Sequence, residues 1–177
     1  VQVGLIGGGA FAQRTILPAL AKLDQVRLKG VATAGGRSAH SLAEKYGASY
    51  ATTSYEDILG DEEINLVVIA TRHGLHASMV VEALKAGKDV FVEKPLALTI
   101  DELRAVAEAC ASSPGRLMVG FNRRFAPMIT QIRDHFQNRS TPLMVHYRVN
   151  AGQVPAANWV HDPVEGGGRI LGEVCHF

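Results

Sequence analysis

Short apolar runs alternate with amphipathic segments along most of the chain. The runs Leu66–Ala70 and Val90–Val92 are apolar at successive positions, as in strands that are covered on both faces. Between such runs, apolar residues recur at helical spacing, as Leu17 and Leu20 do. This alternation predicts an α/β fold, a Rossmann-type doubly wound parallel sheet with helices on both faces. We expect strands at 1–7, 26–33, 49–51, 65–70, 89–92 and 116–120, and helices at 10–23, 38–46, 54–59, 74–86 and 99–112.

The pattern changes after Gly120. A predicted helix at 125–137 and an alternating strand at 142–150 precede a stretch rich in Gly, Pro and Asn, and the last residues look like the opening of a further helix or strand. A second domain with one strand cannot bury a sheet face. We therefore predict a Rossmann domain over 1–121 and the truncated start of an α/β second domain over 122–177, in a chain cut from something longer.

Composition narrows the class of protein. The formal net charge of the 177 residues is +1 with both signs dispersed, which argues against a nucleic-acid partner or a membrane surface. No apolar stretch reaches the ~18 residues of a membrane span. Cys110 and Cys175 lie far apart, so reduced thiols in a cytoplasmic protein are expected. Neither the cysteines nor the pair His73 and His76 has the spacing of a metal site.

The first residues carry a chemical signal. An apolar run ends in Gly7-Gly8-Gly9 and leads through Ala12 into a helical pattern, which gives the order G-x-G-x-x-A. Gly7 permits a sharp turn, Gly9 leaves space for phosphates, and Ala12 lets the helix pack closely on the strand. The helix would direct its unpaired N–H groups at the anion. This order predicts a dinucleotide site, although glycine-rich strand ends also occur where no nucleotide binds.

A second cluster follows the expected strand 89–92, which ends in Glu93-Lys94-Pro95. The carboxyl ends of parallel strands line the ligand crevice, so Glu93 and Lys94 are expected where substrate and cofactor meet. Pro95 restricts Lys94 to extended backbone. Lys94 is therefore a candidate proton acceptor. The alternative is a surface Lys–Glu pair in a loop.

The end of the second expected strand bears on the choice of coenzyme. In NAD-binding chains an acidic residue about 20 positions past the glycines binds the ribose 2′-hydroxyl, and the stretch Val31–Ser38 contains none. Arg37 and Ser38 have the donors to bind a 2′-phosphate, which favours NADP over NAD. The alternative is that these two residues open a solvated helix, with Ser38 as its N-cap.

Five segments, in this order, resemble the glucose-fructose oxidoreductase/inositol dehydrogenase (Gfo/Idh/MocA) family. They are the glycine turn, the turn at 70–76, the Glu-Lys-Pro segment 86–96, the segment 120–125 and the Gly-rich approach to His176. The resemblance implies an NAD(P)-binding Rossmann domain, then a substrate and oligomerisation domain, and hydride transfer between NAD(P) and a hydroxyl carbon of a sugar, polyol or similar small molecule. The chain looks closest to members fused behind a zinc-alcohol-dehydrogenase-like domain. A homo-oligomer through the second domain is a further implication.

The resemblance also implies roles for single residues. Lys94 would face the oxygen of the reacting carbon, and His176 would share the hydroxyl proton with it. The implied cofactor contacts are Gly7, Gly9, Ala10, Phe11, Ala12, Thr33, Arg37, Thr71, His76 and Glu93. A polar and aromatic set beyond residue 121 would line a hydroxyl-rich substrate, and from it we select Arg123, Asn158 and Trp159.

One position departs from the family pattern. Members often have an Asp four residues before the catalytic histidine, and here that residue is Gly172. Either Asp162 or Glu173 could supply the carboxylate that orients His176. On a helix, Glu173 would point about 100° away from the direction of residue 172. This departure and the incomplete second domain predict an inactive fragment. They also keep open a non-catalytic NAD(P)-binding sensor or assembly module, whereas the Glu-Lys-Pro segment favours an enzyme.

Overall fold

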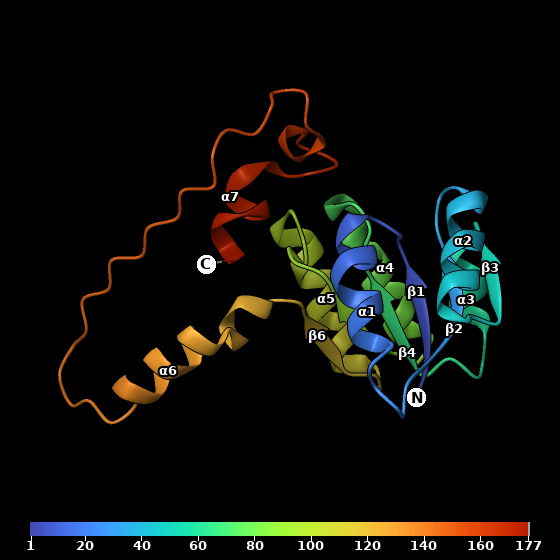
Figure 1. The fold of residues 1–177 in the computed structure, drawn as a ribbon, viewed down its shortest axis with the longest axis horizontal. Helices are drawn as coiled ribbons and strands as arrows, with labels where there is room; N and C mark the ends of the chain where they lie inside the picture. Colours follow the sequence, from blue (N-terminus) through green and yellow to red (C-terminus); the bar gives the residue numbers. More distant parts are fainter. Residues whose placement is uncertain (177) are drawn as a thin grey trace.

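A computed structural model describes residues 1–176. Its centre is a six-stranded parallel sheet in the order β3-β2-β1-β4-β5-β6 (Figure 1). This is the strand order of doubly wound dinucleotide-binding folds, so the predicted fold class is confirmed. All six strands form within one residue of their expected bounds. They are β1 (Gln2–Ile6), β2 (Arg27–Ala32), β3 (Tyr50–Thr52), β4 (Leu66–Ile69), β5 (Asp89–Val92) and β6 (Leu117–Val119).

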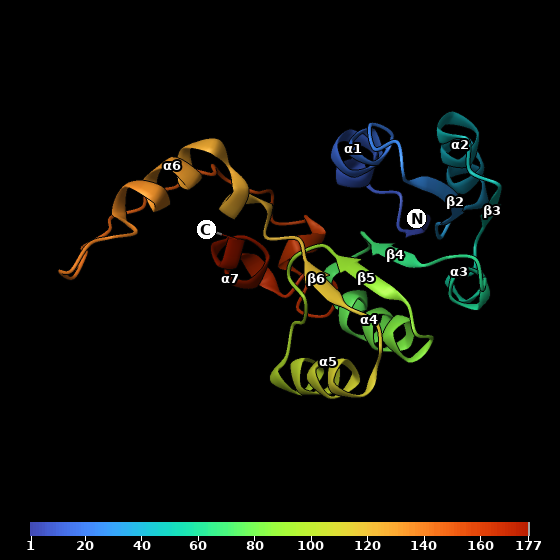
Figure 2. The same ribbon diagram turned by 90° about the horizontal axis from the view of Figure 1, so that it is seen from below.

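Helices cover both faces of this sheet, with α1 and α2 on one side and α4 and α5 on the other (Figure 2). Successive residues of β1 point to opposite faces of the sheet. Leu5 packs in the hydrophobic cluster with α1 and α2, and Ile6 packs in the cluster with α4 and α5. The helices are a π-helical turn η1 (Ala12–Ile16) that continues into α1 (Leu17–Leu20), then α2 (Gly36–Tyr46), α3 (Tyr55–Gly60), α4 (His76–Lys85) after the 3-10 turn η2 (His73–Leu75), and α5 (Ile100–Ser112).

Local signals in the sequence set several helix ends. Thr99 and Glu102 form a reciprocal capping box at the start of α5. Gly47 ends α2 in the left-handed region, with φ of 68°. Ser38 is not the N-cap of α2, because the helix begins one turn earlier and Gly35 is its N-cap. The first helix ends at Leu20, three residues before the expected end.

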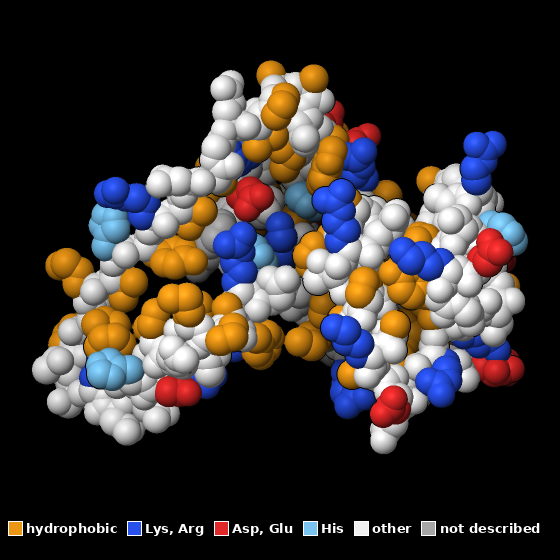
Figure 3. All heavy atoms as spheres, viewed as in Figure 1, with side chains coloured by type: hydrophobic (Ala, Val, Ile, Leu, Met, Phe, Trp, Pro, Cys, Tyr) orange, Lys and Arg blue, Asp and Glu red, His pale blue; other side chains and the backbone are white. Residues whose placement is uncertain are grey.

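The chain leaves the sheet after β6. The 3-10 turn η3 (Asn122–Phe125) and α6 (Pro127–Phe136) project away from the layers (Figure 1). The strand predicted at 142–150 is wrong: this segment is irregular and exposed, and Met144 is 96% exposed. A strand needs a neighbour for its backbone N–H and C=O groups, and among residues 1–176 none pairs with it. Hydrophobic side chains gather over this part of the molecule (Figure 3).

Residues 155–176, which we name the return segment, run back to the carboxyl ends of β4 and β5. The backbone N–H of Gly74 donates to the Glu165 carbonyl at 3.0 Å, and the Arg72 guanidinium lies 3.9 Å from the Glu165 carboxylate. The element expected near the end of the chain is helical, and Phe177 lies outside the described residues. The return segment contains η4 (Trp159–His161), α7 (Gly168–Gly172) and η5 (Val174–His176).

Candidate cofactor and active site

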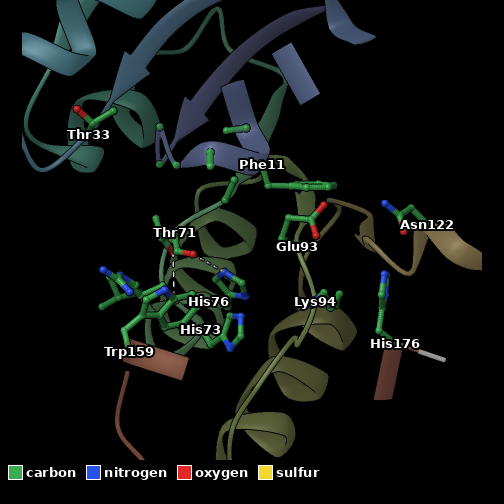
Figure 4. A pocket seen from close by; sticks show the side chains of 18 of the residues that line it. Phe11, Thr33, Thr71, His73, His76, Glu93, Lys94, Asn122, Trp159 and His176 are labelled. Carbon is green, nitrogen blue, oxygen red and sulfur yellow. Dashed lines mark hydrogen bonds between the residues drawn. The ribbon is translucent and has the colours of Figure 1, made fainter. Parts of the chain in front are cut away.

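A cavity of about 730 Å³ opens at the carboxyl ends of β1, β4 and β5 and extends beneath the return segment (Figure 4). It brings together every site residue expected from the sequence except Arg37 and Asn158. Its lining comprises Gly7, Gly8, Gly9, Ala10, Phe11, Ala12, Thr33, Ala34, Ala70, Thr71, Arg72, His73, Leu75, His76, Glu93, Lys94, Asn122, Arg123, Trp159, Glu173 and His176.

The glycine turn forms one end of this cavity. Gly7 has φ of 99°, and a Cβ there would overlap the carbonyl oxygen of Ala70, so only glycine fits. At Gly9 a Cβ would find its nearest atom 4.0 Å away, which leaves open space beside the backbone. Ala12 is 1% exposed, so it packs closely at the start of the helix. The turn therefore fits a dinucleotide pyrophosphate approaching the first helical N–H groups.

The end of β2 presents hydroxyl groups. The Thr33 hydroxyl donates to the Gly35 carbonyl at 2.8 Å, and Thr33 Oγ1 lies 2.7 Å from Ser38 Oγ. Thr33 lines the cavity, whereas Arg37 lies exposed in the first turn of α2 and does not. Arg37 thus lies in the turn of α2 whose Ser38 contacts Thr33, and Thr33 is at the edge of the cavity.

His76 joins the ends of two strands. It is fully buried, and its Nδ1 lies 2.7 Å from the Pro95 carbonyl oxygen while Nε2 lies 3.3 Å from the Thr71 carbonyl oxygen. Carbonyl oxygens only accept, so the shorter contact assigns the N–H of the neutral ring to Nδ1. Burial lowers the pKa of His76 and keeps it neutral, although the bond to Pro95 opposes the shift. His76 is therefore a buried link and not a helix-surface histidine.

Glu93 and Lys94 lie in the middle of the cavity, which does not fit a surface ion pair in a loop (Figure 4). Burial raises the pKa of Glu93, with the backbone and charge of Lys94 acting against it. A Cβ at Gly120 would come within 2.8 Å of Glu93 Oε1, so a side chain there would displace this carboxylate from its present position. Lys94 Nζ donates to the Gly172 carbonyl oxygen at 2.7 Å. The Lys94–Pro95 peptide bond is cis.

His176 reaches the same cavity from the return segment. Burial lowers its pKa, and the positive charges of Lys94 and Arg123 act in the same direction, so the ring is neutral near pH 7. Glu173 opposes this shift and also lines the cavity. The helical geometry expected to turn Glu173 away does not hold, because α7 ends at Gly172 and Glu173 is not helical, with φ of −127°.

Asp162, the other candidate carboxylate, is occupied elsewhere. Its Oδ1 accepts the backbone N–H groups of Glu165 and Val164, both at 2.8 Å. These bonds, that to Glu165 foremost, lower the pKa of Asp162. Asp162 therefore holds the turn before α7, and Glu173 is the acidic residue that the return segment brings to the cavity.

The residues selected for a substrate divide in the structure. Trp159 and Arg123 line the cavity, whereas Asn158 is exposed outside it and caps η4, its Oδ1 accepting from the Val160 N–H at 3.1 Å. The Arg72 guanidinium lies 4.4 Å from the Trp159 ring centroid, and the His73 ring meets the indole edge-on at 4.7 Å. Arg72 and His73 thus both pack against the Trp159 ring at the wall of the cavity, and the indole is partly buried.

Sequence reasoning missed several lining residues, of which Arg72, His73 and Asn122 carry polar groups. All three stand in segments that follow a strand of the sheet, at its carboxyl end. Selecting every polar residue directly after β4 and β6 would have found them.

Comparison with known proteins agrees with this geometry. Residues 1–121 match the sequence model of GFO_IDH_MocA, described as "Oxidoreductase family, NAD-binding Rossmann fold". The chain belongs to the Gfo/Idh/MocA family. Inositol 2-dehydrogenase of Rhizobium meliloti (strain 1021) is 34% identical over 133 residues, which are 75% of this chain and 39% of that relative. The chain spans about two fifths of the length of the curated relatives it matches first.

Solved structures of the family resemble this one closely. Levoglucosan dehydrogenase in complex with NADH and levoglucosan superposes with a TM-score of 0.86 at 26% identity, over 99% of this chain and 51% of that chain. A 3-ketoreductase from Actinomadura kijaniata in complex with NADP superposes with a TM-score of 0.72 at 26% identity, over 77% of this chain and 44% of that chain. Family members thus bind NADP or NADH. Among residues 1–176 of this Gfo/Idh/MocA chain, no helix is long and apolar enough to span a membrane.

Proposed function

We propose that this chain is the cofactor-binding part of an NAD(P)-dependent oxidoreductase that transfers hydride between nicotinamide and a hydroxyl carbon of a sugar or polyol. One observation carries the proposal: the glycine turn, Lys94 and His176 line the same cavity. Related dehydrogenases named for inositol and levoglucosan support the substrate class. The activity belongs to the whole protein of which these residues form part.

The residues divide the proton chemistry between them. The chemistry that bound nicotinamide would supply is a hydride acceptor, for the carbinol hydrogen with the electron pair of its C–H bond. Lys94 donates a hydrogen bond to the oxygen on that carbon and stabilises the negative charge that develops there. His176 is neutral because its pKa is lowered, so it accepts the hydroxyl proton. Glu93 lies between Lys94 and Phe11 in the cavity (Figure 4), where it would contact the nicotinamide ribose.

The preferred coenzyme is NADP. No acidic residue follows β2 to bind a ribose 2′-hydroxyl, and Arg37 stands in the first turn of α2, close to Thr33 at the cavity rim. Separate titrations with NAD and NADP test this preference. Arg37→Ala weakens NADP binding about tenfold and leaves NAD unchanged, whereas Lys45→Ala near the other end of α2 changes neither. Tight binding of NAD alone by the unaltered protein would exclude the preference.

Turnover of the full-length protein tests the hydride transfer. Lys94→Ala lowers kcat on a panel of polyols and sugars by about 10³-fold, a usual loss when a donor that stabilises charge on the reacting oxygen is removed. Coenzyme affinity stays within a factor of about two, because the glycine turn is unchanged. Lys85→Ala, exposed near the end of α4, serves as the matched control. Unchanged turnover in Lys94→Ala would contradict the role given to this lysine.

Five expectations complete the proposal. We expect a domain boundary at residue 121, where the family match also ends. We expect the part alone to be inactive, because the rest of the substrate site would lie in the remainder of the second domain. A homo-oligomer through that domain, a cytoplasmic location and a fused zinc-alcohol-dehydrogenase-like domain are further predictions. A non-catalytic sensor is the alternative function, and it requires coenzyme binding with no turnover of any polyol by the full-length protein.

A further inference from the structure

His73 has no part in the chemistry above, yet it is one of the most constrained side chains in the cavity. It begins the turn η2 directly after the end of β4 and is only 9% exposed. Figure 4 places it with Trp159 in the half of the cavity away from the glycine turn, on the side of Lys94. A ligand that fills this half therefore meets His73 beyond the coenzyme.

The ring presents a hydrogen-bond acceptor. Its Nδ1 lies 2.9 Å from the carbonyl oxygen of Gly166, and because a carbonyl only accepts, Nδ1 carries the N–H. Burial lowers the pKa of His73, and the charges of Lys94 and Arg72 add to this effect, so the ring stays neutral with an unprotonated Nε2. Within residues 1–176 no group forms a hydrogen bond to Nε2.

The position of the ring is fixed on several sides. Its plane meets Trp159 edge-on at a centroid distance of 4.7 Å, and the ring of His76 lies 5.8 Å away. At Gly172 an added Cβ would stand 3.1 Å from the Cε1 atom of His73, so the imidazole fills the space that a side chain there would take. The acceptor is thus held in place before a ligand arrives, as binding groups require.

Lys94 and His73 converge on one residue. Lys94 Nζ binds the carbonyl oxygen of Gly172 at 2.7 Å, and the His73 ring abuts the α-carbon side of the same glycine. A cationic donor and a neutral acceptor side by side match two neighbouring hydroxyl groups, one on the reacting carbon and one beside it. A substrate with a single hydroxyl leaves the acceptor without a partner.

We propose that His73 is a further substrate-binding residue, whose Nε2 accepts a hydrogen bond from the hydroxyl adjacent to the one bound by Lys94, so that the site selects vicinal diols. This inference rests on the proposed function, which identifies the hydroxyl bound by Lys94 as the one on the reacting carbon. It assigns to the Gfo/Idh/MocA chain a specificity determinant that lies before α4 and outside the Glu-Lys-Pro segment.

Two substitutions separate the roles of the two ring nitrogens in the full-length protein. His73→Asn keeps a donor near the Nδ1 position and so keeps the bond to Gly166, but it removes the Nε2 acceptor. His73→Gln keeps a polar atom near the Nε2 position. Affinity and KM are measured with a panel of cyclic polyols headed by myo-inositol, with cyclohexanol as the single-hydroxyl control and the coenzyme as the second control.

The expected result is selective. His73→Asn raises Kd and KM for the polyols about tenfold, the value of one hydrogen bond, and leaves cyclohexanol and coenzyme unchanged. His73→Gln recovers most of the loss. Equal effects on polyols and cyclohexanol, a change confined to the coenzyme, or no change in His73→Asn would overturn the proposal.

A second measurement keeps this assignment distinct from the proposed function. Nitrogen-15 NMR of the free protein shows His73 with its proton on Nδ1 and a bare Nε2. A proton on Nε2 overturns the acceptor role whatever the enzyme turns over. Polyols that bind without turnover exclude hydride transfer and leave the acceptor role supported, and a protein that binds none of them excludes both.

Discussion

The Lys94 ammonium donates a hydrogen bond of 2.7 Å to the carbonyl oxygen of Gly172, which lies 78 residues further along the chain. The contact ties the end of β5 to the return segment. Because the partner is a carbonyl and not a carboxylate, it orients the ammonium without neutralising it. A lysine has three N–H donors, and no other hydrogen bond of this one is found among residues 1–176, so two donors are free for a substrate oxygen.

Gly172 itself is the first test of this arrangement. Gly172→Asp restores the residue common in the family, but its Cβ would lie 3.1 Å from His73 Cε1 and 3.3 Å from Val160 Cγ2. The new carboxylate then stands beside the imidazole, and we expect the pKa of His73 to rise by about one unit or more. NMR titration of the ring measures this shift. Gly172→Ala, which adds the Cβ without charge, is the control, and an equal shift in both variants would contradict the electrostatic cause.

The glycine turn gives a prediction for stability. Gly7→Ala forces a Cβ against the Ala70 carbonyl at a φ of 99°, so we expect the free energy of unfolding to fall by on the order of 2 kcal/mol. Gly60→Ala, where a Cβ meets nothing within 4 Å, should change it little. Urea denaturation of both variants measures the difference. Equal stability of the two would show that the turn tolerates a side chain.

The pKa of His176 predicts the acid limb of the pH profile. In the proposed mechanism its neutral form is the proton acceptor, and burial with the charges of Lys94 and Arg123 holds its pKa below the ordinary value of 6.5. The full-length enzyme should therefore keep kcat/KM for polyol oxidation as the pH falls to 6.5 and lose it below that value. Arg123→Gln removes one of the charges and should move the limb upward. If the acid limb does not move in this variant, the charge of Arg123 does not contribute to the lowered pKa of His176.

His76 predicts a pH dependence of folding. Burial lowers its pKa below 6.5 in the folded state, so between the folded and the unfolded pKa the unfolded chain binds more protons. Stability is therefore fully present above pH 6.5 and is lost as the pH falls towards the folded pKa, by at most about 1.4 kcal/mol per pH unit for each such histidine.

His76→Asn tests this dependence, because it keeps a donor near Pro95 and does not titrate. Thermal unfolding between pH 7 and pH 5 should show a shallower slope in this variant. His73 is also buried with a lowered pKa, so it accounts for part of the pH dependence that remains in His76→Asn. His40→Asn, exposed on α2, is the matched control and should keep the slope of the unaltered protein.

The sheet could be predicted from the sequence because its strands are buried on both faces. Runs such as Leu66–Ile69 are apolar at every position, which is typical of strands covered on both faces. Glycines and capping residues mark the ends of the neighbouring helices. The cavity followed from one rule, that ligands bind at the carboxyl ends of parallel strands. Gly7, Glu93 and Lys94 could thus be selected before any coordinates were known.

The second part of the site could not be predicted in the same way. The alternation at 142–150 indicates a strand, but pairing depends on a neighbour that a local pattern does not specify. Asn158 has the chemistry of a sugar ligand and instead accepts a hydrogen bond from the Val160 N–H. The position of His73 after β4 marks it as a residue near the cavity, but its contacts with Gly166 and Trp159 form only after the chain has returned across the sheet, so a local pattern does not specify them.

The return segment also sets an order of assembly. All strands of the sheet precede it in the chain, so the nucleotide end of the cavity can fold while the remaining residues are still being synthesised. On the ribosome, a nascent chain would then complete the sheet and the glycine turn before it completes the return segment, which brings His176 to the cavity.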